Sequence, residues 1–135
     1  MNTLITLSKG ENKVFDVFSR CLWNRSGIQL ESGNAYKIEV IGNQWWVDFY
    51  IPTGADGYSF PLLRSYESSR RVPNQNWFKL IGTIGNNIQN PIIIGRKFED
   101  YIRLETGELC CFANDLATMY WNNWGSLRIT VTRAD

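Results

Sequence analysis

Short runs of alternating apolar and polar residues, separated by turn-forming residues, constrain the fold of this chain more than any other feature. Apolar side chains alternate with polar ones over residues 36–41 and again over residues 127–132. This period of two is typical of strands that are buried on one face. Turn residues divide the runs at 31–34, 41–43, 52–57, 85–87 and 105–107. Because no window of about 11 residues has a helical period, the pattern predicts an all-β, jelly-roll-like antiparallel β-sandwich.

The length of 135 residues suits a single domain covering residues 1–135. We predict strands at residues 3–7, 13–23, 27–30, 36–41, 44–50, 77–84, 91–95, 101–104, 108–113 and 127–131. The least regular stretch, residues 51–76, is predicted to be a long loop with a short strand near residues 58–62. Loops of that length in a small domain often carry function.

Composition excludes several classes of protein. The chain has no histidine, so it has neither a Ser-His-Asp triad nor a histidine-ligated zinc. Its formal net charge of +1 lacks the basic excess of a nucleic-acid binder, so no nucleic-acid partner is expected. The three cysteines contain no CxxC pair, which predicts small apolar residues in a reducing compartment and not a disulfide scaffold.

The amino-terminal residues do not have the pattern of a targeting segment. Residues 1–9 contain neither a basic region nor an apolar run of about seven residues, so no signal peptide is predicted. No stretch approaches the roughly 18 apolar residues of a membrane span. We therefore expect a cytoplasmic location, with leaderless export as the alternative.

The loop at residues 114–123 is the first candidate for chemistry. Asp115, Asn122 and Asn123 supply one carboxylate and two amide oxygens between two predicted strands. Calcium prefers such oxygens, together with main-chain carbonyls. The alternative is that these residues form ordinary turns, in which their side chains bond the local backbone.

Two other segments each allow two interpretations. On the strand at 44–50, Trp46, Asp48 and Tyr50 share one face, where the aromatic residues either fill the core or flank Asp48 on a ligand platform. Residues 64–71 contain three arginines and Glu67. They form either a solvated loop with balanced charge or a weak contact for an anion.

Several short motifs occur in an order that resembles a known family. They are the turn at residues 27–34, residues 38–42 followed by Trp46-Val47-Asp48, the segment Leu80-Ile81-Gly82-Thr83-Ile84-Gly85, residues 106–109 leading into Asn114-Asp115, and residues 120–127. Together they cover about residues 16–133. This arrangement resembles the LecA-like soluble bacterial lectins, which are calcium-dependent and galactophilic.

The resemblance implies a calcium site and a sugar site at one loop. The implied calcium ligands are the side chains of Asp115, Asn122 and Asn123 and the main-chain carbonyls of Phe49 and Met119. Two neighbouring sugar hydroxyls would complete the coordination of the ion and hydrogen-bond Asp115 and Asn122. Asp48, Tyr50 and Trp121 would form the rim of the sugar site.

The chain also departs from the galactose-binding pattern. That pattern adds a His-Pro pair and a glutamine against the sugar, and Ser65, Tyr66 and Ser68 fall at those positions here. Bulky Met119 and Trp121 replace small residues of the loop. We therefore predict a non-catalytic, calcium-assisted carbohydrate-binding module in which a homo-oligomer supplies avidity. The alternative is an assembly protein that has lost sugar binding, and a hydrolase with two carboxylates ranks third.

Overall fold

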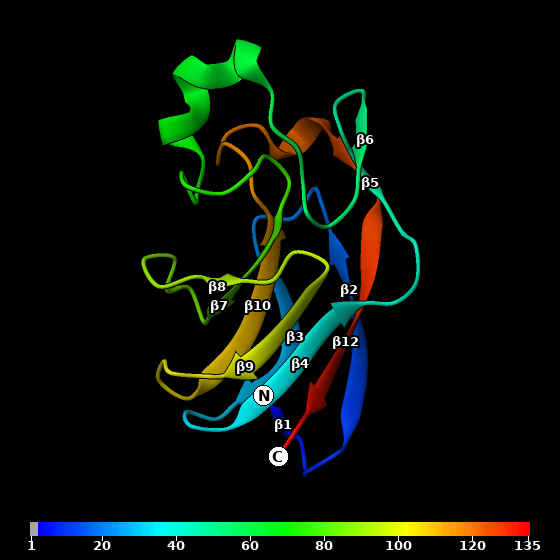
Figure 1. Ribbon diagram of the computed structural model, residues 1–135, viewed down its shortest axis with the longest axis vertical. Helices are drawn as coiled ribbons and strands as arrows, with labels where there is room; N and C mark the ends of the chain where they lie inside the picture. Colours follow the sequence, from blue (N-terminus) through cyan, green and yellow to red (C-terminus); the bar gives the residue numbers. More distant parts are fainter. Residues whose placement is uncertain (1–2) are drawn as a thin grey trace.

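Two sheets face one another and enclose the apolar side chains of the alternating runs. The computed structural model describes residues 3–135 (Figure 1). The five-stranded sheet has the order β1 (Ile5–Thr6), β3 (Asn24–Leu30), β10 (Gly107–Ala113), β7 (Leu80–Ile84) and β8 (Ile92–Ile93). The four-stranded sheet has the order β2 (Asn12–Phe18), β12 (Ser126–Arg133), β4 (Ala35–Val40) and β9 (Lys97–Tyr101). All pairs in these two sheets are antiparallel except β1 and β3, which confirms the predicted jelly-roll-like sandwich.

The register of the strands explains the alternating pattern in the sequence. Val131 in β12 pairs with Ile38 in β4, and both side chains are fully buried between the sheets. Arg128 alternates with the buried residues of β12 and faces solvent. In contrast, all five residues of β7 are buried, because a second apolar cluster covers the outer face of its sheet.

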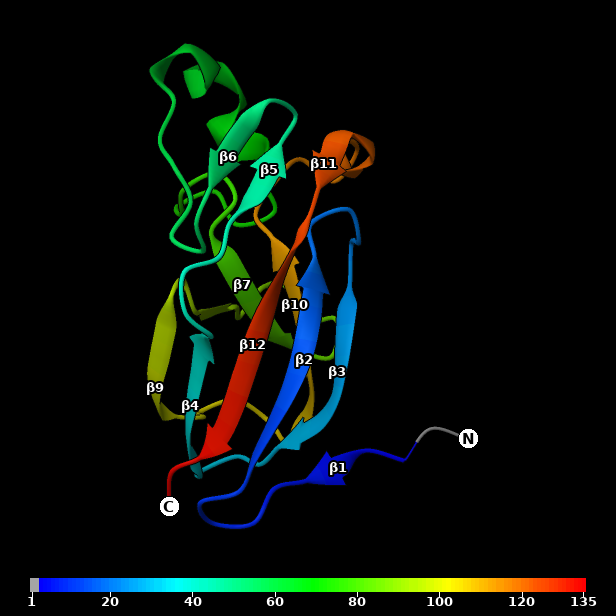
Figure 2. The same cartoon turned by 90° about the vertical axis from the view of Figure 1, so that its right-hand side faces the viewer.

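A smaller third sheet lies at one end of the sandwich. It has the order β11 (Asn123–Trp124), β5 (Trp46–Asp48) and β6 (Ile51–Thr53). Two 3₁₀ helices, η1 (Pro61–Ser69) and η2 (Tyr120–Asn122), lie at the same end. Figures 1 and 2 both place this end opposite β1 and the carboxyl terminus. The third sheet was not predicted as a separate unit.

The predicted strand near residues 58–62 is wrong. Tyr58 forms only an isolated bridge with Trp77, and η1 begins at Pro61. Proline suits this position because the first helical residues need no intrahelical N–H donor. Neither η1 nor any other helix in the described part of the chain is long and apolar enough to cross a bilayer.

Several predicted strand boundaries are also wrong. The strand expected at residues 101–104 is β9, which ends at Tyr101 and carries mostly exposed polar side chains. It forms by pairing with β4 along the edge of the sheet, so its hydrophobic pattern is weak. The strand expected to reach residue 23 ends at Phe18, where the N–H of Cys21 donates to the carbonyl of Phe18 and turns the chain.

The three cysteines are free thiols, as predicted, but only two are buried. Cys110 and Cys111 lie in the core strand β10, and burial raises the pKa of the Cys110 thiol to about 11. Cys21 is exposed, so its prediction as an interior apolar residue is wrong.

Gly57 is required by the close approach of two backbone segments beside this end of the sandwich. Its φ is +72°, and a Cβ atom there would lie 2.2 Å from the Trp77 carbonyl oxygen and 2.6 Å from the Lys79 nitrogen. We expect Gly57→Ala to lower the free energy of unfolding by about 3 kcal/mol or more, through left-handed strain plus the clash. Gly33→Ala, at φ +89° with open space around it, should lose only about 1 kcal/mol. Urea denaturation of both variants checks this, and equal losses would contradict it.

Candidate ligand-binding site

A cavity of about 570 Å³ opens between the β5–β6 hairpin, η1 and the loop that follows β10. Six of the eight residues predicted for a site line it: Asp48, Phe49, Asp115, Met119, Trp121 and Asn122. The remaining wall consists of Ile51, Tyr58, Leu63, Tyr66, Trp77 and Leu116. The family pattern places Tyr66 against the sugar, and the other five were not predicted. Residues separated by up to 74 positions (48 to 122) therefore meet at one end of the sandwich.

The other two predicted residues do not line the cavity. Asn123 is fully buried and contacts Asp115 from behind, through a hydrogen bond from its Nδ2 to Asp115 Oδ2 of 3.1 Å. Tyr50 is 81% exposed, and its ring packs on Phe49 with 4.1 Å between the ring centroids. Asn123 is therefore placed to orient Asp115, whereas Tyr50 extends the apolar rim outward.

Asp115 is held in one orientation by two hydrogen bonds. Its Oδ1 accepts from the N–H of Leu116 at 2.7 Å, and its Oδ2 accepts from Asn123. The Asn123 amide is itself fixed, because it also donates to the carbonyl of Ser19 at 3.0 Å. The carboxylate is thus buried and oriented at the wall of the cavity.

Asp48 is oriented by a residue that sequence reasoning did not single out. The Tyr58 hydroxyl donates to Asp48 Oδ2. Tyr58 is fixed by two main-chain hydrogen bonds with Trp77, of 2.8 and 3.0 Å. The only feature of the sequence that could have pointed to Tyr58 is the preceding residue, Gly57, because a glycine is needed where two backbone segments approach closely. The register of the third sheet pairs Asp48 with Asn123.

The two carboxylates lie in an unfavourable electrostatic environment. Burial and, as the smaller effect, the nearby negative charge of Asp48 together raise the pKa of Asp115 to about 6. Burial also raises the pKa of Asp48, against the opposing effect of the hydrogen bond from Tyr58. No lysine or arginine lines the cavity, so neither carboxylate has a cationic partner there. A bound cation would offset this cost.

Two buried amide oxygens near Asp115 accept no hydrogen bond from residues 3–135. They are Oδ1 of Asn122 and Oδ1 of Asn123. Buried acceptors are nearly always satisfied, so two orphaned oxygens beside a buried carboxylate indicate a missing donor or cation. Among residues 3–135, no three His, Cys, Asp or Glu side chains gather as a metal site. Any cation here would depend on amide and main-chain oxygens, a donor set that fits calcium.

Phe49, at the turn of the β5–β6 hairpin, has a strained backbone and also connects the hairpin to the loop by a hydrogen bond. Phe49 has a φ of +58°, which is the left-handed region that non-glycine residues rarely occupy. Its N–H donates to the main-chain carbonyl of Asn122 at 3.1 Å. The carbonyl of Met119 accepts a long hydrogen bond of 3.4 Å from the Asn122 N–H. Strain of this kind is often found at functional sites.

Most of residues 64–69 are exposed and Glu67 pairs with Arg70, as the interpretation of a solvated loop with balanced charge expects, but Arg70 and Arg71 also stabilise the long loop. The guanidinium of Arg71 lies 3.6 Å from the centroid of the Phe112 ring and donates to the Tyr120 hydroxyl at 3.0 Å. Arg70 lies over Trp77 and donates to the carbonyls of Glu67 and Pro73. Both guanidinium groups therefore have partners within the protein, and neither is a free anion contact.

The cavity combines an oxygen-rich side with an apolar side. Asp48, Asp115 and Asn122 supply acceptors, whereas Leu63, Trp77 and Trp121 supply apolar surface. Trp121 is 64% exposed. Such a cavity can hold a ligand that presents hydroxyl groups on one side and an apolar face on the other.

Comparison with known proteins assigns the fold. No family model matches the sequence, and no curated protein matches it significantly. A solved structure described as "EclA N-terminal domain; PllA-like lectin" superposes with a TM-score of 0.61 and 18% sequence identity. The similarity covers 89% of this chain and 94% of that chain. The protein therefore has a lectin-like β-sandwich fold. At this identity the likeness concerns the course of the backbone and not the residues of a site.

The raised pKa of Asp115 predicts how stability depends on pH in the calcium-free protein. Between its ordinary pKa of 3.8 and its value of about 6 in the fold, the folded state binds more protons than the unfolded state. Stability should therefore fall as the pH rises through this window, by roughly 2–3 kcal/mol. Asp115→Asn should lack this loss, so it should gain stability relative to the wild type between pH 4 and pH 7. Urea denaturation across this range measures the difference, and a constant difference would contradict the prediction.

Proposed function

We propose that this protein is a non-catalytic carbohydrate-binding module whose site is the cavity beside Asp115 and which binds sugar with the help of calcium. The observation that carries the proposal is the pair of orphaned amide oxygens beside two carboxylates that lack a cationic partner. The apolar wall and the lectin-like fold support the same class of ligand.

The proposed calcium ligands come from the loop and from the hairpin. They are the side-chain oxygens of Asp115, Asn122 and Asn123 and the carbonyls of Phe49 and Met119. Five protein ligands are fewer than the six to eight that calcium takes, so the bound ion would offer positions to two neighbouring sugar hydroxyls. The buried Asp115 must be ionised to serve as a ligand, which predicts weaker binding in acid.

The chain's own residues would then select the sugar. The hydrogen bond from Tyr58 fixes the Asp48 carboxylate, so the other carboxylate oxygen can accept from a sugar hydroxyl only in one direction. A sugar whose hydroxyl pointed elsewhere would leave this carboxylate unpaired, which costs binding free energy. The exposed ring of Trp121 at the mouth offers a flat surface to the C–H face of the sugar.

The calcium part of the proposal is tested by thermal unfolding. With a Kd near ~10 μM, ~1 mM calcium should stabilise the protein by about 2.7 kcal/mol, which raises Tm by several degrees. Asp115→Asn should abolish the shift, because it removes the charged ligand. Asp16→Asn removes an equivalent charge from the surface pair with Arg128 and should keep it. An unchanged melting curve for the wild type, with calcium or with a chelator, would exclude the calcium site.

The sugar part is tested by isothermal titration against a glycan panel that includes galactosides, with and without calcium. We expect modest affinity for monosaccharides, lost when calcium is removed. Trp121→Ala should weaken binding about fivefold, equivalent to about 1 kcal/mol of aromatic contact. Trp124→Ala is the matched control, since Trp124 is 57% exposed but does not line the cavity. Folded protein that binds no glycan under either condition would defeat the proposal.

The second candidate is an assembly protein on the same sandwich. The observation that favours it is the set of exposed apolar side chains around the cavity: Phe49, Tyr50, Leu62, Tyr66 and Trp121. Contiguous apolar surface often marks a protein interface. This candidate is supported if light scattering shows a homo-oligomer that Asp115→Ala leaves intact, while calcium and glycans have no effect. In the carbohydrate candidate, the same oligomer would supply avidity.

A further inference from the structure

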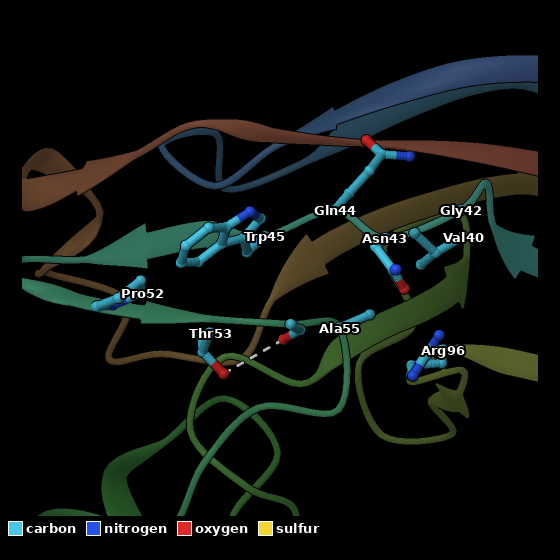
Figure 3. Close-up of a pocket in the computed structure, with 10 residues that line it drawn as sticks. Val40, Gly42, Asn43, Gln44, Trp45, Pro52, Thr53, Ala55 and Arg96 are labelled. Atoms are coloured by element: carbon cyan, nitrogen blue, oxygen red, sulfur yellow. Dashed lines mark hydrogen bonds between the residues drawn. The ribbon is translucent and has the colours of Figure 1, made fainter.

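A second cavity, of about 370 Å³, lies at the base of the β5–β6 hairpin, between the segment that leads into β5 and the segment that leaves β6 (Figure 3). Trp45, Pro52 and Thr53 line it, whereas Asp48 and Ile51 of the same hairpin line the Asp115 cavity. The two cavities share no lining residue. The second cavity can therefore bind a ligand independently of Asp115 and of calcium.

Trp45 provides a flat apolar surface at one end of the second cavity. Its side chain is 69% exposed, although the next residue, Trp46, is fully buried in the core. Figure 3 shows the indole of Trp45 on the same side of the cavity as Pro52. An exposed tryptophan beside a proline suits the apolar face of a ring-shaped ligand.

Arg96 provides a positive charge at the other end (Figure 3). Its main-chain N–H donates to Asp56 Oδ1 at 2.9 Å, which fixes the backbone. Its guanidinium forms no ion pair within residues 3–135, unlike those of Arg25, Arg103 and Arg128. An exposed guanidinium is well suited to bind a carboxylate through two parallel hydrogen bonds.

The polar groups between these two ends differ in their availability. The Gln44 amide is fully used, because it accepts from the Arg128 N–H at 2.8 Å and donates to the carbonyls of Ile41 and Arg128. It fixes the loop that carries Asn43 and Trp45. The Asn43 side chain makes no hydrogen bond to any described residue and lies between Trp45 and Arg96 in Figure 3. Its amide can both accept from and donate to hydroxyl groups.

We propose that this second cavity binds a carboxylated sugar, such as a uronic acid residue. The apolar face of the sugar ring packs on Trp45, its carboxylate pairs with Arg96, and its hydroxyls bond the Asn43 amide. A neutral sugar would not pair with the Arg96 guanidinium. A small carboxylate such as acetate would not cover the Trp45 indole. The ligand must therefore carry both a ring and a charge.

Two-dimensional NMR of the labelled full chain, titrated with methyl glucuronide and with methyl glucoside, tests this proposal. The glucuronide should shift the Trp45 indole signal and the signals of residues 42–45, 52–55 and 96, which line the second cavity, and should leave those of Asp48 and Asp115 in place. It should bind at least about tenfold more tightly than the glucoside. Arg96→Gln and Trp45→Ala should each weaken glucuronide binding about fivefold to tenfold. Arg103→Gln and Trp124→Ala remove an equivalent charge and an equivalent exposed ring outside the cavity, and should leave binding unchanged.

The same titration separates this site from the Asp115 cavity. Calcium-free Asp115→Asn should bind the glucuronide as the wild type does, so failure of the calcium-assisted site does not affect the result. Equal binding of the two sugars would overturn the proposal, as would glucuronide binding that neither Arg96→Gln nor Trp45→Ala weakens. Displacement of the glucuronide by an equal concentration of acetate, or of a peptide carboxylate, would also overturn it.

Discussion

The hydrogen bonds of one buried side chain, Asn114, hold the functional end of the sandwich together. Its Oδ1 accepts from the Val72 N–H at 2.9 Å, and its Nδ2 donates to the carbonyls of Val72, Gln75 and Asn76. Its main chain pairs with Phe78 and Lys79 just before β7. An apolar residue here would leave several buried polar groups unsatisfied. The long loop, the start of β7 and the position of Asp115 all depend on this side chain.

Asp115 follows Asn114 directly, so the hydrogen bonds of Asn114 also fix the position of the Asp115 carboxylate. That position is buried, which makes the ionised form of the carboxylate unfavourable. The hydrogen bonds from Leu116 and Asn123 orient Asp115 but do not offset its burial and the charge of Asp48, since its pKa stays raised to about 6. A fold that needed only turns in this loop would not require two carboxylates at one cavity. This excess of negative charge and of unpaired oxygen favours a ligand over the purely structural interpretation of the Asn-Asp and Asn-Asn pairs.

The sequence indicated the sheets and most of the polar residues of the site, but not the wall that surrounds them. In β4 and β12, apolar and polar residues alternate because one face of each strand is buried. This pattern is visible over a few consecutive residues, and it predicted both strands well. Tyr58 contacts Asp48 only because the irregular loop turns back onto Trp77, and no local period encodes that path. The arginines of the same loop look like surface charge in the sequence, yet the guanidinium of Arg71 packs on the ring of Phe112. Long-range packing decided each of these cases.

The β5–β6 hairpin links the two proposed sites physically. The residues at its turn, Asp48, Phe49 and Ile51, line the cavity beside Asp115, and Pro52 and Thr53 line the cavity beside Arg96. The strained φ of Phe49 sits at the turn of this hairpin, where its N–H bonds the Asn122 carbonyl. The two sites therefore share one hairpin but no lining residue, so a substitution in one cavity leaves the lining of the other unchanged.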